Sequence, residues 1–202
     1  MKTYQLILML LASSLAVTSC QHKPDQKWDA KSSADTLNNM KDSVADSNKS
    51  VTKDLVMKVS KPDAKFAVEA ANGGMAEVAL GQLAVQKGTS QQVKDFGAMM
   101  VKDHSAAGEK LKALAKDKGI SLPQGISDDE KKLKDHLTAQ SGDDFDKAYV
   151  KAMVEDHQED IKSFEVAVTQ LKDPELKGFA TQTLPTLKMH LAAIQKIQTS
   201  AK

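Results

Sequence analysis

The chain has 202 residues, enough for one domain of average size or two small ones, and its aromatic content of 4 % requires a mainly aliphatic core, which favours helices over a β-sandwich or barrel. Hydrophobic residues make up 41 % and charged residues 27 %, a balance typical of a globular protein. All 28 basic residues are lysines, against 27 acidic residues. Because arginine supplies the best contacts to bases and phosphates, we expect no nucleic-acid partner.

The first 20 residues have the pattern of a bacterial lipoprotein signal. Lys2 precedes an apolar run at 6–11, and small residues lead to VTSC at 17–20, which contains the single cysteine of the chain. We interpret residues 1–19 as a signal peptide and Cys20 as the acylated first residue of the mature protein. This predicts a lipid anchor in the membrane and a place in the bacterial cell envelope, at the outer membrane or in the periplasm. The alternative is an ordinary cleaved signal with a stray cysteine.

Residues 20–61 are polar and rich in lysine and aspartate, and we interpret them as a lipidated, flexible tether. Scattered apolar residues do recur at helical spacing, so a weak amphipathic helix over about 35–58 is the alternative. A flexible coil of some 40 residues reaches roughly 35 Å, enough to hold a domain away from a membrane surface.

Four long segments with helical periodicity follow. They cover residues 63–87, 90–119, 144–172 and 174 onward. Ser90 is placed to cap the second segment, Gly119 to end it, and Pro174 to open the fourth, where a missing N–H costs nothing. Short links inside each pair of segments predict two helical hairpins.

The connection over 120–143 is long enough to cross the bundle, and we expect it to contain one short helix. A repeat supports two related hairpins, because the sequence at 90–97 parallels that at 173–180. Two hairpins joined by a long crossover form the ferritin-like topology. We therefore predict an all-α fold with a ferritin-like four-helix bundle over 62–202.

Several ordered motifs carry a family resemblance. They are GGMAEVALGQLA at 73–84, the pattern Met-Val-x-Asp-His at 100–104 and 153–157, SGxxFDxxY at 141–149, and LPxLxxH at 184–190. Over about 66–197 the chain resembles a ferritin-like family of outer-membrane or periplasmic bacterial proteins known only as a domain of unknown function. The resemblance implies a fold and a compartment, but no activity.

Three histidines fall in the middle of apolar helix stripes. His104, His157 and His190 belong to the second, third and fourth segments, and Glu77 lies on a face of the first segment that we expect to be at least partly buried. All four lie within about four residues of mid-height, roughly 6 Å along the bundle. Three imidazoles and one carboxylate suit a divalent transition metal, so these four residues are candidate metal ligands. The neighbouring Asp103 and Asp156 are candidate acceptors for ligand histidines.

A second interpretation of these histidines is a buried polar network that fixes helix register. A standard di-iron site is disfavoured, because the Glu-x-x-His pair of such sites is missing before all three histidines. We expect His136, in the connection, and His22, in the tether, to be solvated. Gly73, Gly74 and Gly81 would leave room beside Glu77, and the alternative is that Gly73 and Gly74 let two helices approach closely.

The sequence offers no nucleophile elbow and no phosphate-binding glycine loop, so no catalytic residue is assigned. The first functional hypothesis is a non-enzymatic envelope lipoprotein whose bundle binds a partner or ligand, in a stress-related role. The alternative is a metal-binding or metal-dependent redox protein that uses the mid-bundle histidine and glutamate site.

Overall fold

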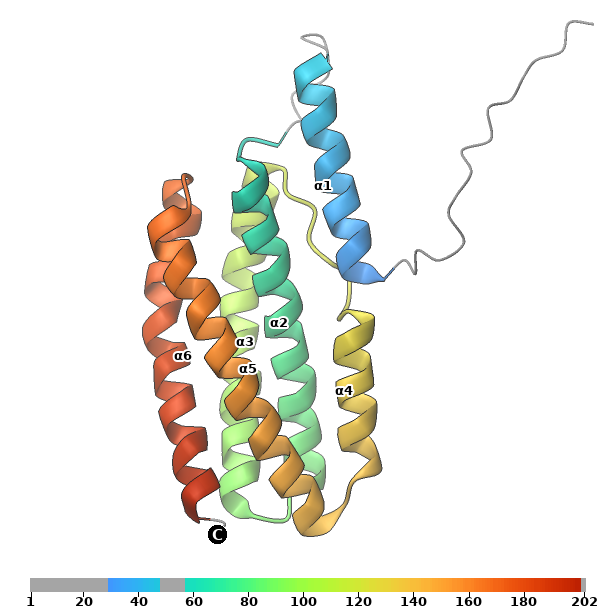
Figure 1. Ribbon diagram of the computed structural model, residues 1–202, viewed down its shortest axis with the longest axis vertical. Coiled ribbons are helices and arrows are strands. Elements are labelled where there is room, and N and C mark those ends of the chain that lie inside the picture. Colours follow the sequence, from blue (N-terminus) through green and yellow to red (C-terminus); the bar gives the residue numbers. More distant parts are fainter. Residues whose placement is uncertain (1–28, 48–56, 201–202) are drawn as a thin grey trace, which may run out of the picture.

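The computed structural model describes residues 29–47 and 57–200, and this part of the chain consists of six helices without a strand (Figure 1). The helices are α1 Ala30–Ser47, α2 Lys61–Lys87, α3 Gln91–Lys118, α4 Asp128–Ala139, α5 Gly142–Gln170 and α6 Pro174–Ser200. The all-α prediction is confirmed. The expected signal peptide, Cys20 and His22 lie outside the described residues. Within the two described ranges, no helix is long and apolar enough to cross a membrane.

The helix ends follow from local capping. Ser60 and Ser90 use their side-chain oxygens to accept hydrogen bonds from the backbone N–H groups of Asp63 and Val93, which satisfies free donors at the starts of α2 and α3. Gly119 ends α3 with a φ of 71°, a left-handed conformation that glycine adopts without steric cost. The four long helices accordingly begin and end within about two residues of the positions expected from the sequence.

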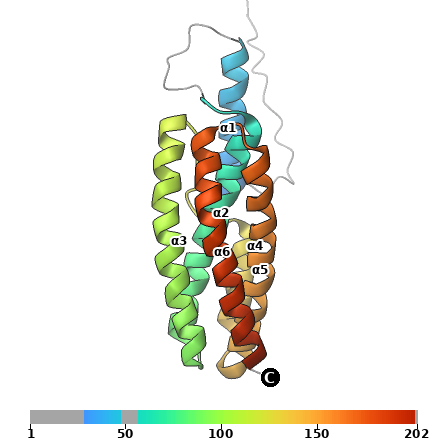
Figure 2. The same ribbon diagram turned by 90° about the vertical axis from the view of Figure 1, so that its left-hand side faces the viewer.

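Four long helices form a bundle of two hairpins. Helix α2 packs along α3 and α5 packs along α6, while α2 also contacts α5 and α3 contacts α6 (Figures 1 and 2). The connection after α3 leads the chain back along the bundle through α4, so that α5 starts at the opposite end from the one where α3 finishes. The short helix predicted in the connection is present as α4.

The buried apolar residues form two clusters, with a polar layer between them. One cluster includes Phe66, Leu111, Phe164 and Leu187, and the other includes Leu80, Met100, Val154 and Ile194. Each long helix contains one of the named residues of each cluster, and between these two residues in the sequence lies a buried polar residue. These four polar residues are Glu77, His104, His157 and His190. The core therefore positions one such polar side chain from each long helix at mid-height.

Close helix approach occurs at a different pair of glycines from the one predicted. A Cβ on Gly81 would lie 2.6 Å from the carbonyl oxygen of Gly97, and a Cβ on Gly97 would lie 2.6 Å from that of Gly81. A Cβ on Gly73 would instead meet only the carboxylate of Asp160, at 3.7 Å, and one on Gly74 meets nothing within 4 Å. The contact between α2 and α3 thus depends on Gly81 and Gly97, and the close-approach interpretation of Gly73 and Gly74 is wrong.

The prediction of a flexible tether is wrong for residues 30–47, which form α1 and pack against α2 and the connection. Ala34 is 2 % exposed. The amide of Asn38 donates from Nδ2 to the carbonyl oxygen of Ser121, and its Oδ1 accepts from the N–H of Ser121, at 2.9 and 2.7 Å. Met57, at the start of the second described range, belongs to the buried core. The packed part of the chain therefore begins before residue 62, and the observed helix starts earlier than the alternative placed over 35–58.

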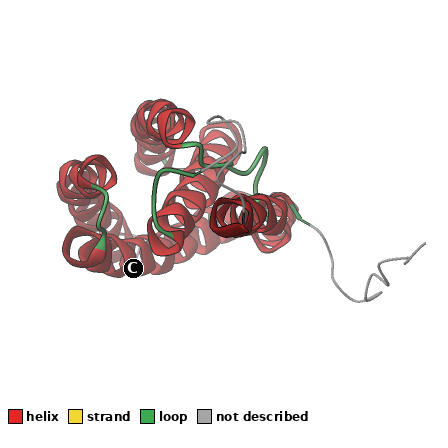
Figure 3. Ribbon diagram, turned by 90° about the horizontal axis from the view of Figure 1, so that it is seen from above, coloured by secondary structure: helices red, strands yellow, loops and turns green. Residues whose placement is uncertain are grey.

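Seen from above, along the long axis, the helices appear nearly end-on, joined by loops (Figure 3). The polar layer is enclosed by α2, α3, α5 and α6, each of which supplies one of its side chains. The bundle thus brings together residues that are up to 113 positions apart in the sequence, from Glu77 to His190.

Candidate metal centre

The four candidate ligands predicted from the sequence lie together. His104 of α3, His157 of α5 and His190 of α6 are 7 %, 0 % and 0 % exposed, and one ring nitrogen from each lies within 4.8 Å of the others. Glu77 of α2 is 1 % exposed. Its Oε2 lies 2.6 Å from Nδ1 of His104, and its Oε1 lies 3.5 Å from Nε2 of His157. Metal binding by this cluster stays a prediction.

Two of the imidazoles are oriented by acceptors on their outer sides. His157 donates from Nδ1 to the carbonyl oxygen of Met153 at 3.0 Å, and His190 donates from Nε2 to the carboxylate of Asp103 at 3.0 Å. Since a carbonyl and a carboxylate only accept, these contacts place the proton of each neutral ring on the outer nitrogen. Nε2 of His157 and Nδ1 of His190 then carry lone pairs that face the centre of the cluster.

Burial keeps the imidazoles neutral. It lowers the pKa of His104 to about 4, and burial together with the neighbouring histidines lowers the pKa of His157 to about 3. The pKa of His190 is also lowered, mainly by burial, although its hydrogen bond to Asp103 opposes the shift. At neutral pH each of these rings therefore carries one proton.

The proton positions on His104 and Glu77 follow from the proton position on His190. Nε2 of His104 lies 3.4 Å from Nδ1 of His190, and because that atom has a lone pair, His104 donates from Nε2. Nδ1 of His104 is then an acceptor, so the proton in its 2.6 Å contact belongs to Glu77. A protonated Glu77 agrees with its pKa, which burial and the nearby Asp160 raise well above its ordinary value.

This arrangement leaves two acceptors facing each other. Oε1 of Glu77 is the carbonyl oxygen of a protonated carboxyl group, and Nε2 of His157 is a bare ring nitrogen, 3.5 Å away. Both atoms are buried and neither has a hydrogen-bond partner. Buried acceptors without donors are rare and costly, so a donor or a cation is expected beside these two atoms.

Two further polar groups of α5 extend the cluster. Asp156, named as a candidate acceptor from the sequence, lies beside Glu77 and His157, with one ligand atom from each of the three within 4.8 Å of the others. Its Oδ2 is buried without a hydrogen-bond partner. Burial and the neighbouring Glu77 raise the pKa of Asp156 well above its ordinary value. Tyr149, one helical turn before Met153, also buries an unpartnered hydroxyl group here.

Asp160 belongs to the site although the sequence did not single it out. Burial, with a contribution from Glu130 of α4, raises the pKa of this carboxyl group to about 6 against the opposing effect of His104. Its position could have been found, because Asp160 lies three residues after His157 and four after Asp156, on the same helix face. In the described part of the chain, the ion pairs of Glu77 and Asp156 are with histidines, and no lysine neutralises this group of acids.

The remaining histidine of the described residues does not take part. His136 lies on α4, where it is exposed, as expected from the sequence. Three of the four described histidines are therefore buried at the site, and the exposed His136 is a matched control for experiments.

Comparison with known proteins identifies a family but no activity. A family model described as "Domain of unknown function (DUF4142)" matches residues 50–197. No curated protein matches the chain. Among solved structures, the fold is similar to the crystal structure of a DUF305 fragment from Deinococcus radiodurans, with a TM-score of 0.63 and 11 % identity over 70 % of this chain and 98 % of that one. At this identity the likeness concerns the fold alone.

Proposed function

Since the chain belongs to the DUF4142 family, a domain of unknown function, we propose its function from its own site: the bundle binds one divalent transition metal at the mid-height cluster. The ligands are His104, His157 and His190, and Glu77 supports His104 as a hydrogen-bond acceptor. The observation that supports this proposal most is that the three histidines bring one ring nitrogen each within 4.8 Å of one another, while Nε2 of His157 is buried without a hydrogen-bond partner.

A bound cation would need only a small change in protonation. Glu77 would lose its proton, and His104 would move its proton to Nδ1 and donate it to Oε2 of Glu77, which would free Nε2 of His104. Nε2 of His104, Nε2 of His157 and Nδ1 of His190 would then hold the ion. Glu77, a candidate fourth ligand from the sequence, would instead be the acceptor behind His104, because its carboxylate contacts Nδ1, on the side of the ring opposite Nε2. Binding therefore releases about one proton.

The observed separations are compatible with such an ion. Ligand atoms about 2.0–2.2 Å from a common metal lie roughly 3–4 Å from each other. Nε2 of His104 and Nδ1 of His190 are 3.4 Å apart, and one ring nitrogen from each of the three histidines lies within 4.8 Å of the others. Imidazole and carboxylate donors suit Zn²⁺, Fe²⁺ or Mn²⁺. Asp103 and the Met153 carbonyl would hold two ligand rings in place, as acceptors behind metal-bound histidines commonly do.

The competing proposal is a binding module without a metal, whose histidines form a core network. Metal titration of the full chain after treatment with a chelator separates the two. Zn²⁺ at 100 times its Kd would raise the unfolding free energy by about 2.7 kcal/mol through preferential binding to the folded state. His157→Ala should abolish this effect and His136→Ala should preserve it. If metal has no effect and His157→Leu stabilises the protein, the histidines are a structural network.

We also propose a lipid-anchored protein of the bacterial envelope with a ferritin-like bundle. The bundle's two hairpins and its long connection support that class, and the VTSC sequence supports the anchor. Metabolic labelling with a fatty acid tests the anchor, because wild-type protein should incorporate label at Cys20 and Cys20→Ser should not. Wild-type protein without label would indicate an ordinary secreted form.

A further inference from the structure

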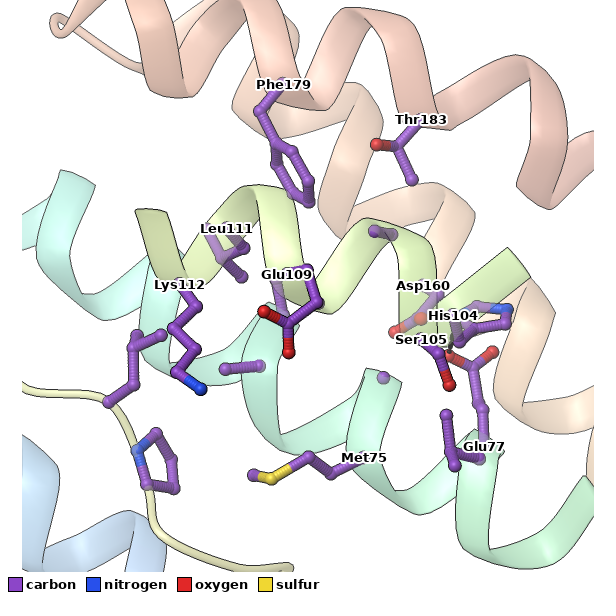
Figure 4. Close-up of a pocket in the computed structure, with 18 of the residues that line it drawn as sticks. Met75, Glu77, His104, Ser105, Glu109, Leu111, Lys112, Asp160, Phe179 and Thr183 are labelled. Atoms are coloured by element: carbon purple, nitrogen blue, oxygen red, sulfur yellow. Dashed lines mark ion pairs between the residues drawn. The ribbon is translucent and has the colours of Figure 1, made fainter. Parts of the chain in front are cut away.

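A cavity of about 440 Å³ leads from the surface to the edge of the histidine cluster (Figure 4). Its inner end is formed by Glu77, His104 and Asp160, and its rim by exposed residues of α3, including Glu109 and Lys112. The connection between α3 and α4 borders it at Pro123. The volume lies in the range of small-molecule sites, which are concave and combine apolar walls with a few polar groups.

The walls between the two ends are mainly apolar. Met75, Leu111, Phe164 and Phe179 line them, and Figure 4 shows the ring of Phe179 directed toward the cavity. The polar groups gather at the inner end and the rim. A molecule that fills this space would therefore bury an apolar body and present its polar group at Glu77 and Asp160.

Gly74, in the interior of α2, lines this cavity and has no other structural reason to be glycine. A glycine inside a helix costs about 1 kcal/mol relative to alanine. Gly74 is not among the glycines with positive φ, and a Cβ placed on it meets nothing within 4 Å. Gly81, by contrast, is required by the close approach of α3. The missing side chain at Gly74 keeps space open beside the cavity.

The charges of the lining favour a cation. Beside the protonated Glu77, two carboxylates, Glu109 and Asp160, line the cavity, against the one lysine Lys112. Asp160 has neither a hydrogen bond nor an ion pair with a lysine within the two described ranges, although burial is unfavourable for a carboxylate. An ammonium group placed at the inner end would supply both the charge and the donors that Asp160 lacks.

We propose that the cavity binds a small amphipathic amine, whose ammonium group donates to Asp160 and whose apolar body packs against Phe179 and Met75. This site adjoins the proposed metal ligands but includes only His104 of them, because His157 and His190 do not line the cavity. The amine site therefore does not depend on the proposed metal function.

Three probes with the same ring and a different head group test this proposal. Binding of 2-phenylethylamine, 2-phenylethanol and 3-phenylpropanoate to the full chain is measured by isothermal titration at pH 7.5, with and without Zn²⁺. The amine should bind at least about tenfold more tightly than the alcohol, as expected for a charge-assisted hydrogen bond, and the anion should bind most weakly. Asp160→Asn should remove the preference for the amine over the alcohol.

Cavity-filling variants test the location. Gly74→Leu and Ala107→Leu, on two sides of the cavity, should weaken binding of both the amine and the alcohol about tenfold or more. Gly178→Leu is the matched control, since Gly178 lies on α6 outside the lining and a Cβ there also meets nothing within 4 Å. Helical circular dichroism confirms that each variant is folded, and two filling variants keep the test valid if one does not fold.

The proposal is overturned if the folded wild-type chain gives no saturable amine binding, if the alcohol or the anion binds as tightly as the amine, or if both filling variants bind like Gly178→Leu. Failure here is distinguishable from failure of the metal proposal. The same variants retain His104, His157, His190 and Glu77, so their Zn²⁺ titrations report on the metal site separately.

Discussion

Replacing Asp160 with asparagine should stabilise the metal-free protein at neutral pH and have little effect at low pH. Burial raises the pKa of Asp160 from 3.8 to about 6, while His104 of α3 lowers it and Glu130 of α4 and Glu159 of α5 raise it. Below pH 3.8 the carboxyl group is protonated in both the folded and the unfolded chain. Between pH 3.8 and about 6 the folded chain keeps a proton that the unfolded chain has released, so the unfolding free energy falls as the pH rises.

The difference between these two pKa values corresponds to about 3 kcal/mol of unfolding free energy, which is lost in full above about pH 6. The amide of Asp160→Asn carries no charge at any pH, so this variant should exceed wild type by about 3 kcal/mol at pH 7.5 and by almost nothing at pH 4. Urea unfolding of chelator-treated protein at several pH values measures this difference. Asp135→Asn, at an exposed carboxylate of α4, is the control. A gain that is equal at all pH values, or a loss at pH 7.5, would refute the reasoning.

Two further predictions concern stability. A chain that begins at Lys61 lacks α1, whose Asn38 and Lys41 make four hydrogen bonds with Gly119 and Ser121, and it also lacks Met57 and the Ser60 cap. Its unfolding free energy should fall by on the order of 1–3 kcal/mol, and an unchanged urea midpoint would show that this whole segment is a dispensable tether. Gly81→Val should cost about 1–3 kcal/mol, because its side chain collides with the backbone of Gly97. In Gly178→Ala the added methyl group meets open space, so this change should instead stabilise the protein by up to about 1 kcal/mol. Thermal unfolding measures both variants, and equal effects of the two changes would contradict the contact assigned to Gly81 and Gly97.

The bundle helices could be predicted because their signals are local. Ser90 and Gly119 fix the two ends of α3 by capping and by a left-handed conformation, and a spacing of three or four between apolar residues marks each buried face. Helix α1 was predicted only as the weaker alternative, over 35–58, because its sequence is polar. The contact of Asn38 with the backbone of Ser121, 83 residues away, helps to attach it, and no local pattern reveals such a contact.

The candidate site could be predicted in part, because the position of a histidine on a helix face is a local signal. A histidine in the middle of an apolar stripe stands out, so the meeting of His104, His157 and His190 followed from helix faces and heights. Asp160 did not stand out, because acidic residues are common on solvated helix faces. The protonation pattern was also beyond the sequence, since it depends on the contacts of His157 with the Met153 carbonyl and of His190 with Asp103.

The most direct test of the proposed metal function is anomalous diffraction from crystals grown with Zn²⁺, recorded at the zinc edge. We predict one peak about 2.0–2.2 Å from Nε2 of His104, Nε2 of His157 and Nδ1 of His190, with Glu77 hydrogen-bonded to Nδ1 of His104. A map with well-ordered imidazoles and no peak between them, or with zinc only at exposed residues such as His136, would contradict the metal site and leave the histidines as a buried structural network.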